Sequence, residues 1–161
     1  MIRKCKLSDI SRIYFIINEA ARAYEGVIPH DCYHQPYMPV AELEREMKRM
    51  TLYGWTEDGE LVGVMGIEPV KDVTLIRHAY VLPGRQNKGI GAGLLKHLMS
   101  LTKTRRLLVG TWEANKNAIR FYERYGFKLR TDKDELLKTY WDISARQIET
   151  SIVLEIETPS G

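Results

Sequence analysis

Hydrophobic and polar positions along the chain follow two patterns, and each pattern predicts one kind of element. Apolar residues at every second position predict strands, and apolar residues three or four apart predict helices. Strands are expected over residues 2–6, 52–56, 61–67, 73–81, 106–112, 127–130 and 148–156. Helices are expected over residues 8–24 with Ser8 as the N-cap, 40–50, 90–101, 115–125 and 135–141.

The order of these elements, β-α-α-β-β-β-α-β-α-β-(α)-β, predicts the fold class. It lacks the strict alternation of strand and helix that builds a doubly wound parallel sheet. Asp58 and Gly59 stand between two strand patterns and form a strong hairpin signal. We therefore expect an α+β fold with a central mixed, mostly antiparallel sheet that is flanked by helices on both faces.

Composition narrows the class of protein further. The 161 residues are 44% hydrophobic and 28% charged, which is typical of a single globular domain, here residues 1–161. No apolar run approaches the roughly 20 residues that cross a bilayer, and the polar N-terminus does not resemble a signal peptide. We expect a cytoplasmic protein with no membrane partner, in which Cys5 and Cys32 are free thiols.

The charge balance argues against a nucleic-acid partner. Lys and Arg number 24 and Asp and Glu 21, giving a formal net charge of +3 that is spread along the chain. This is too mild to indicate a nucleic-acid partner, so none is expected. The chain could still bind a small polyanionic ligand if basic residues converge on one site.

The segment between strand 73–81 and helix 90–101 carries the clearest chemical signal. A helix N-terminus presents unpaired N–H groups and the positive end of the helix dipole, which together attract anions. Gly89 and Gly91 leave the backbone open to a pyrophosphate, and Arg85 and Lys88 add positive charge. The alternative is an ordinary glycine-containing turn, because a lone G-x-G is a weak signal.

Two well-known phosphate motifs do not fit this segment. Ile90 and Gly91 stand where a P-loop has Lys and Ser or Thr. Leu94 stands where the dinucleotide-binding fingerprint has its third glycine. The anion site, if present, belongs to another family.

Two motifs in order identify that family. Residues 86–91 match the pattern Q/R-x-x-G-x-G/A, after a V-x-P strand exit at 81–83, although Asn87 stands where many members have glycine. The pattern N-x-x-A-x-x-x-Y-x-x-x-G-F is matched further on by Asn115, Ala118, Tyr122, Gly126 and Phe127. Over residues 2–156 the chain resembles the GNAT superfamily of acyl-CoA-dependent N-acetyltransferases. The resemblance implies a sheet that is splayed at the cofactor site.

The resemblance implies acetyl-CoA as the cosubstrate, with no metal. The residues that would contact it are Ala79, Tyr80, Val81, Gln86, Asn87, Lys88, Gly89, Ile90, Gly91, Ala92 and Asn115. It also implies that Tyr122 is the general acid that protonates the leaving thiolate. The alternative is that Tyr122 packs the helix on the sheet together with Phe121 and Tyr125, as aromatic residues at helical spacing often do.

The acceptor amine must lose a proton, and two residues are candidate bases. Family members carry Glu or His at positions that correspond here to Leu75 and Arg77, neither of which can serve. Glu68, at the end of the preceding strand, is one candidate. His78 is the other, although strand alternation turns it to the opposite face unless a bulge intervenes. An amine that arrives neutral needs neither.

The loop after the first helix is expected to wall the acceptor site, as the resemblance implies. Candidate substrate-binding residues are Tyr24, His30, Tyr33, His34 and, on strand 73–81, Arg77. Arg77 would hold a carboxylate of the acceptor or, alternatively, pair with Glu68 or Asp72. His30, Cys32 and His34 lack the spacing of zinc ligands, so no metal is expected.

These observations lead to one functional prediction with open alternatives. The chain is expected to be an N-acetyltransferase that moves an acetyl group from acetyl-CoA directly to a primary amine of a small-molecule or amino acid-like acceptor. The alternatives are a catalytically silent CoA-binding or protein-interaction module on the same fold, and a protein N-terminal or lysine acetyltransferase. The resemblance also implies a homodimer that pairs through residues 148–156.

Overall fold

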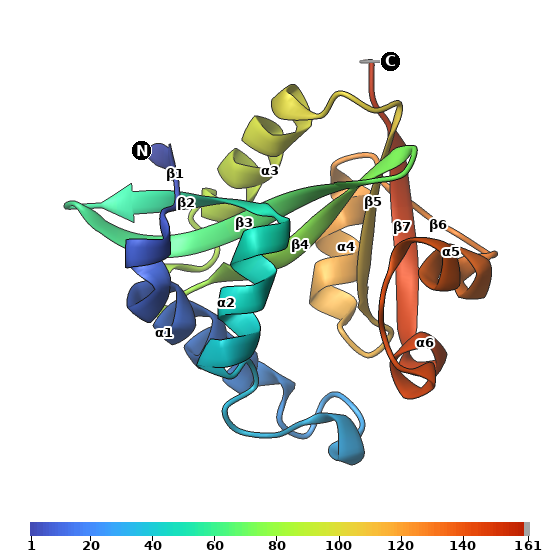
Figure 1. Ribbon diagram of the computed structural model, residues 1–161, viewed down its shortest axis with the longest axis horizontal. Coiled ribbons are helices and arrows are strands. Elements are labelled where there is room, and N and C mark those ends of the chain that lie inside the picture. The colour runs from blue at the N-terminus through green and yellow to red at the C-terminus, as the bar shows by residue number, and fades with distance from the viewer. Residues whose placement is uncertain (160–161) are drawn as a thin grey trace. The chain divides into compact units, whose positions relative to one another are not determined.

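The computed structural model describes residues 1–159, whose strands form one seven-stranded mixed sheet in the order β1-β2-β3-β4-β5-β7-β6 (Figure 1). The strands are β1 (Ile2–Lys4), β2 (Thr51–Glu57), β3 (Glu60–Val70), β4 (Val73–Val81), β5 (Arg106–Trp112), β6 (Lys128–Leu129) and β7 (Ser151–Glu157). The helices are α1 (Ile10–Ala21), α2 (Val40–Arg49), α3 (Ile90–Leu101), α4 (Lys116–Arg124), α5 (Lys133–Tyr140) and α6 (Ala145–Thr150). The predicted α+β fold is confirmed, with one helix more than expected.

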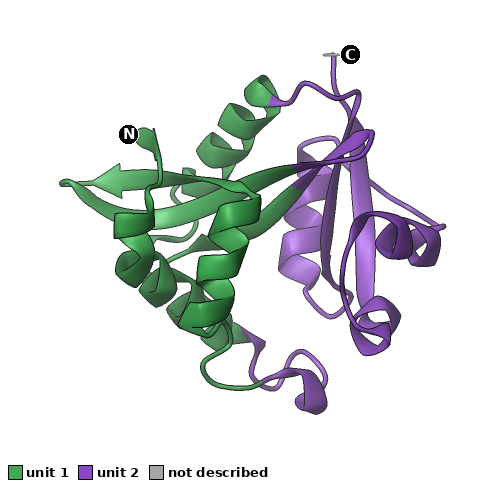
Figure 2. Cartoon of the chain, viewed as in Figure 1, with its two compact units in different colours: residues 1–23, 34–68, 76–101 green, residues 24–33, 69–75, 102–161 purple. Residues whose placement is uncertain are grey.

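The chain divides into two compact units, each built from several segments (Figure 2). Unit 1 comprises residues 1–23, 34–68 and 76–101, and unit 2 comprises residues 24–33, 69–75 and 102–161. Residues 160 and 161 lie outside the described part, and the single domain over 1–161 stays a prediction. Across the described residues, every helix is too short or too polar to span a membrane.

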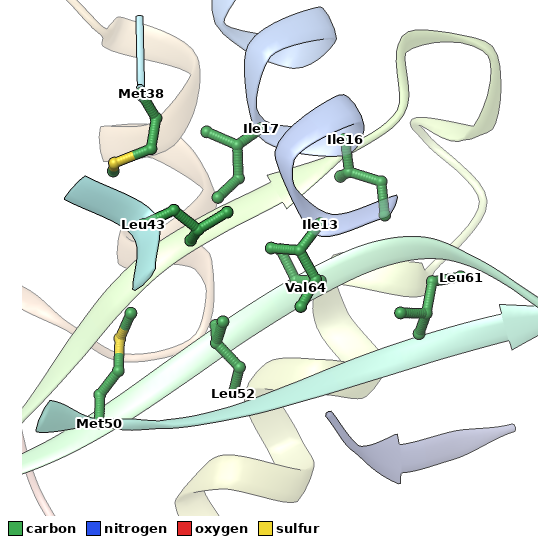
Figure 3. Packing of buried hydrophobic residues seen from close by; sticks show 9 residues of the cluster. All are labelled: Ile13, Ile16, Ile17, Met38, Leu43, Met50, Leu52, Leu61 and Val64. Carbon is green, nitrogen blue, oxygen red and sulfur yellow. The ribbon is translucent and has the colours of Figure 1, made fainter. Parts of the chain in front are cut away.

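In unit 1, helices α1 and α2 pack on one face of strands β2 and β3. The spacing of three and four residues places three isoleucines on one side of α1, where they meet α2 and the two strands. The cluster consists of Ile13, Ile16, Ile17, Met38, Leu43, Met50, Leu52, Leu61 and Val64 (Figure 3). Full burial of such a side chain contributes about 1.5–3 kcal/mol. This cluster therefore holds α2, which carries charged residues of the candidate site, against the sheet.

Helix α3 packs against β2 residues that alternate with those facing α1 and α2. The rings of Tyr53 and His97 meet edge to face, with centroids 5.0 Å apart. A Cβ added at Gly93 would lie 2.6 Å from the Trp55 ring, so only glycine allows this approach of helix to strand. Because Leu52 lies in the α1–α2 cluster while Tyr53 and Trp55 face α3, helices cover both faces of this part of the sheet, as predicted.

Unit 2 also has helices on both faces of its strands. A second cluster joins α5 to β5 and β7 and consists of Val73, Leu75, Leu108, Leu136, Leu137 and Val153. On the same face, the Trp141 indole lies 3.2 Å from where Gly110 would carry a Cβ. Ile156 alternates to the opposite face of β7, where its side chain lies 3.2 Å from the corresponding position of Gly126, at the end of α4.

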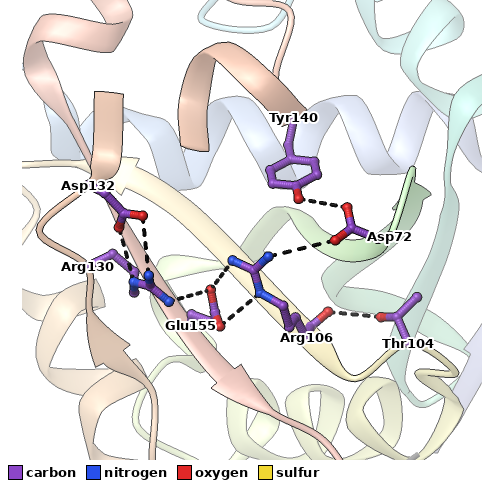
Figure 4. Close-up of polar contacts among 7 residues, drawn as sticks. All are labelled: Asp72, Thr104, Arg106, Arg130, Asp132, Tyr140 and Glu155. Atoms are coloured by element: carbon purple, nitrogen blue, oxygen red, sulfur yellow. Dashed lines mark hydrogen bonds and ion pairs between the residues drawn. The ribbon is translucent and has the colours of Figure 1, made fainter. Parts of the chain in front are cut away.

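A chain of ion pairs ties the ends of β5, β6 and β7 together (Figure 4). Arg106 binds both carboxylate oxygens of Glu155, at 3.0 and 2.7 Å, and Arg130 binds Glu155 at 3.1 Å. The Tyr140 hydroxyl donates to Asp72 at 2.7 Å. Since Asp72 is engaged here, in unit 2, it is not the partner of Arg77 that one of the sequence alternatives proposed.

The predicted N-cap of the first helix and the predicted start of the final strand are wrong. Ser8 does not cap the first helix, because it lies inside a 3-10 turn (Leu7–Asp9) in which the Asp9 carboxylate accepts from the Lys6 N–H at 2.7 Å. Residues 148–150 belong to α6 and not to the final strand. The Ser144 hydroxyl caps that helix by accepting from the Gln147 N–H at 3.2 Å, and Ile148 packs against the unit 2 cluster. A helix of six residues is too short for its periodicity to be visible in the sequence.

The final strand, β7, has neighbours on both sides in the strand order. It pairs with β5 antiparallel from Ser151 to Glu157, and with β6 at Leu154 and Glu155. Most of its β6 side is therefore not covered by strand β6. Pairing of two copies through this strand stays a prediction.

The two cysteines are free thiols, as predicted, and Cys5 is expected to react slowly. Burial against the unit 1 cluster raises the pKa of the Cys5 thiol to about 11, so at pH 8 about one thiol in a thousand is ionised. A Cys32→Ser variant treated with a chromogenic disulfide reagent should react slowly when native and at once in urea. Immediate reaction of the native variant would contradict this expectation.

Candidate functional site

The turn between β4 and α3 has the backbone conformation of an anion site. Asn87 and Gly89 both adopt left-handed conformations, with φ of 63° and 82°. No heavy atom lies within 4 Å of the position that a Gly89 Cβ would occupy, so a ligand can approach the backbone there. Asparagine tolerates the left-handed region better than most residues, which explains why Asn87 can stand where many GNAT members have glycine.

The N-terminus of α3 follows directly. The first N–H that bonds back into this turn is that of Gly93, which donates to the Gly89 carbonyl at 2.9 Å. The amides of Ile90, Gly91 and Ala92 therefore have no partner within the helix and lie at the positive end of its dipole. This is the arrangement in which helices bind phosphate.

Side chains of the turn have separate roles. The Gln86 amide donates to the Val81 carbonyl at 3.0 Å and ties the turn to the end of β4. Arg85 pairs with Glu57 at 2.9 Å, so its charge is already balanced. Lys88 is exposed and, within residues 1–159, has no carboxylate at ion-pair distance. Of the two cations predicted beside the pyrophosphate, Lys88 is thus the one whose charge is available.

A half-buried cluster of five charged or titratable side chains lies between α2, β3 and β4. Arg77 donates to Glu68 at 2.6 Å and to Glu46 at 2.8 Å. Arg49 lies 3.5 Å from Glu68 and 3.9 Å from Glu46, and His78 lies 3.3 Å from Glu46. The hydrogen bond to His78 and the charges of the two arginines lower the pKa of Glu46 to about 2. Glu46 therefore stays ionised throughout the physiological pH range.

The ion pairs of Arg77 bear on the two alternatives that the sequence left open for this residue. Each terminal nitrogen of its guanidinium donates to a carboxylate of this chain, so the predicted ion pair with Glu68 is present. Contact of Arg77 with an acceptor carboxylate stays a prediction. Glu46 is a second partner that the sequence analysis did not foresee. Nothing in the hydrophobic pattern of α2 distinguishes Glu46 from the other glutamates of that helix, Glu42 and Glu44.

His78 lies where the alternation of β4 is broken. Its φ of 53° is in the left-handed region, which costs a residue with a Cβ about 1–2 kcal/mol. Neighbouring residues of a regular strand point to opposite faces, yet Arg77 and His78 both reach Glu46. The strand is therefore irregular at His78, as the proposal of this residue as a base required.

In unit 2, Tyr122 lies in the core of the α4 region. Its ring centroid is 5.1 Å from that of Phe121 and 5.3 Å from that of Phe127. Burial raises the pKa of the Tyr122 phenol, and the nearby phenol of Tyr24 raises it further. Tyr122 thus keeps its proton at neutral pH, and the structure brings one predicted loop residue, Tyr24, close enough to influence it.

Asn115 serves as the N-cap of α4. Its side-chain oxygen accepts from the Ala118 N–H at 3.2 Å, and its amide nitrogen donates to the Thr111 hydroxyl at 3.4 Å. The first residues of the second motif therefore have a structural role of their own, which is to begin the helix that carries Tyr122. Its predicted contact with the cofactor stays a prediction.

The other loop candidates lie in different surroundings. His34 Nδ1 donates a hydrogen bond to the Pro36 carbonyl at 2.8 Å, and the His34 ring stacks on Tyr37 within its own loop. His30 is exposed in a 3-10 turn (His30–Cys32), and Tyr33 directly follows that turn. In the described part of the chain, no group of three or more His, Cys, Asp or Glu side chains has the arrangement to hold a metal ion.

Known proteins match this chain in sequence over the region that contains these residues. The sequence profile of the acetyltransferase (GNAT) family matches residues 13–127. The spermine/spermidine N(1)-acetyltransferase of Bacillus subtilis (strain 168) is 40% identical over 53 residues, which are 30% of this chain and 35% of that protein. The chain thus matches about a third of the length of that curated relative.

Solved structures share the fold at low sequence identity. The PaiA N-acetyltransferase from Thermoplasma acidophilum, solved in complex with coenzyme A, superposes with a TM-score of 0.76 at 18% identity over 98% of both chains. The ribosomal-protein-S18-alanine N-acetyltransferase from Escherichia coli superposes with a TM-score of 0.66 at 18% identity, covering 100% of this chain and 96% of that one. At these identities the likeness is one of fold.

Proposed function

The chain belongs to the acetyltransferase (GNAT) family, and from this premise we propose that it transfers an acetyl group from acetyl-CoA directly to a primary amine of a small molecule. The observation that carries the proposal is the turn before α3. Gly89 leaves the backbone open, and three amides at the helix N-terminus lack partners within the helix. This arrangement suits the pyrophosphate of a coenzyme.

The residues of unit 1 fit acetyl-CoA as cosubstrate. The amides of Ile90, Gly91 and Ala92 would hold the pyrophosphate, with the exposed ammonium of Lys88 beside it. The backbone of Ala79, Tyr80 and Val81, at the end of β4, would hold the pantetheine arm. Bound there, acetyl-CoA would supply the acetyl group as an activated thioester.

Of the two candidate bases, we assign the role to His78. Glu68 is bound by Arg77 at 2.6 Å and faces Arg49 at 3.5 Å, so its carboxylate is already engaged by two cations of this chain. His78 contacts a single carboxylate and carries the side chain type that titrates near neutral pH. His78 would accept the proton that the amine loses as its nitrogen bonds to the acetyl carbon.

Tyr122 would complete the transfer by donating its phenolic proton to the departing thiolate sulfur. Burial keeps that proton in place at neutral pH, as a general acid requires. Developing negative charge on sulfur would then be neutralised as the carbon–sulfur bond breaks. The products of the full step are the N-acetylated amine and the free thiol of CoA.

The acceptor class is supported by the Bacillus relative, which is named as a spermine/spermidine N(1)-acetyltransferase. We therefore propose a small aliphatic amine of the polyamine type as acceptor. The second candidate is the amino group of a protein N-terminus, which the fold also serves in the Escherichia coli alanine N-acetyltransferase. The first is favoured by sequence identity, which is 40% over 53 residues with the Bacillus enzyme and 18% with the Escherichia coli enzyme.

The acceptor is tested by measuring release of the CoA thiol from acetyl-CoA with single acceptors. Spermidine should give turnover well above the hydrolysis background, and a peptide that begins with alanine should give little. Turnover with the peptide alone would replace the proposed acceptor by a protein N-terminus. Background rates with every amine would refute the proposal of small-amine acetylation.

A further inference from the structure

The carboxylate of Glu46 is placed to control the imidazole of His78. The Glu46 Oε1 atom lies 3.3 Å from His78 Nε2, and a carboxylate can only accept a hydrogen bond. Nε2 must therefore carry a hydrogen. In the neutral ring, the basic lone pair then lies on Nδ1, for which residues 1–159 provide no hydrogen-bond partner.

Glu46 is itself rigidly held and permanently charged. Its side chain is 14% exposed, and the same Oε1 atom accepts from Arg77 at 2.8 Å. The cluster around Leu43 and Met50 fixes the helix on which Glu46 lies. A carboxylate that is held in this way can orient a neighbouring ring at little entropic cost.

The charges around His78 nearly balance. Glu46 and Arg49 come from α2, Glu68 from β3 and Arg77 from β4, giving two negative and two positive groups. Among these five side chains, the imidazole is the one whose type changes charge between pH 5 and 8. Removing the charge of Glu46 would leave an excess positive charge beside the ring and disfavour its protonated form.

The backbone conformation of His78 is a second indication that its contact with Glu46 is functional. His78 keeps a left-handed φ of 53°, a conformation that glycine would adopt without strain. Strained residues persist where the surrounding structure holds them, and they cluster at functional sites. Here the strain directs an imidazole, rather than an apolar side chain, toward α2.

From this geometry we propose that Glu46 is a positioning residue for His78, which it holds in the tautomer and orientation that accept the proton of the acceptor amine. The inference rests on the proposed function, in which His78 is the base. As the amine nitrogen bonds to the acetyl carbon, its proton passes to Nδ1, and the resulting imidazolium is stabilised by the Glu46 carboxylate. The proton afterwards leaves to solvent, which restores the neutral ring.

The first test needs no turnover. The Cε1 proton of His78 is followed by NMR against pH, and its signal among the four histidines is assigned by its absence from a His78→Gln variant. In Glu46→Gln, an amide oxygen still accepts from Nε2 but the charge is gone. The titration midpoint of His78 should fall by roughly one pH unit. An unchanged midpoint would overturn the proposal.

The second test uses the rate. Because the base must be neutral, kcat/KM falls on the acid side of its pH profile. Glu46→Gln should move this acid limb to lower pH by the shift that NMR measures and should lower the plateau about tenfold or more. A residue that only stabilised the fold would lower the plateau without moving the limb, and that outcome would refute a positioning role.

Two further variants complete the design. Glu44→Gln makes the same change on the same helix at an exposed position and should leave both midpoint and rate unchanged. Glu46→Asp keeps the charge but withdraws it by one methylene, so it should preserve the midpoint more than Glu46→Gln does and still lower kcat. If wild-type protein acetylates no amine, the proposed function fails, whereas the NMR midpoint still decides whether Glu46 controls His78.

Discussion

Replacing Gly89 with glutamate is expected to lower the affinity for acetyl-CoA at least about a hundredfold, or about 2.7 kcal/mol. The new carboxylate would stand where the backbone is now open and would repel a pyrophosphate held a few ångströms away. It would also impose a Cβ on a φ of 82°. Calorimetric titration of wild type and variant with acetyl-CoA measures the difference.

The strain of the backbone needs its own control, and the chain offers one. Gly26 has a φ of 76° and open space around its Cβ position, so Gly26→Glu imposes the same conformation and charge outside the turn. This variant should bind acetyl-CoA like the wild type. Equal loss in both variants would mean that strain, rather than repulsion at the turn, causes the effect. If the wild-type protein does not bind acetyl-CoA, the proposal that acetyl-CoA is its ligand is refuted.

Tyr122→Phe is expected to lower kcat about a hundredfold while leaving the Kd of acetyl-CoA nearly unchanged. The substitution removes one hydroxyl from a buried ring and keeps its contacts with Phe121 and Phe127. Proton donation to the thiolate would then depend on water. Steady-state rates and calorimetric affinities, measured on the same preparation, separate the two effects.

Tyr125→Phe is the matched control for this prediction. Tyr125 caps the end of the same helix and packs on Phe121, with ring centroids 5.2 Å apart, so the change is chemically identical. It should leave kcat within about twofold, because a residue outside the reacting groups contributes nothing to proton transfer. Unchanged turnover in Tyr122→Phe would show that another group protonates the thiolate.

Most of the fold can be predicted from the sequence because its helices and strands follow local patterns of hydrophobic residues. The hairpin at Asp58 and Gly59 and the first helix, with Ile13 and Ile17 buried on one side, are set by periods of two and of three to four residues, and each is found where expected. The turn at residues 86–91 is likewise local, since its glycines and the helix that follows are adjacent in the chain. Such features need no knowledge of distant residues.

The charged cluster could not be predicted in the same way. Its members come from three elements, and Glu46 meets Arg77 across 31 residues of sequence. The left-handed φ of His78 could not be predicted either, because histidine indicates positive φ far more weakly than glycine does. Helix α6 was missed for a related reason, since six residues are too few to show a period. Long-range pairing and local strain therefore have to be read from the structure.

The contact of Gly93 with Trp55 links ligand binding to core packing. Two glycines in the first turn of α3, at 91 and 93, weaken that helix by about 1 kcal/mol each relative to alanine. Packing against the tryptophan ring has to offset this cost, and the amides proposed to bind phosphate begin the same helix. A cosubstrate that binds only the folded turn would stabilise the tryptophan contact through mass action. The midpoint of thermal unfolding should thus rise with the acetyl-CoA concentration. The increase would reflect the packing of Trp55 on the sheet as well as the turn that binds the cosubstrate.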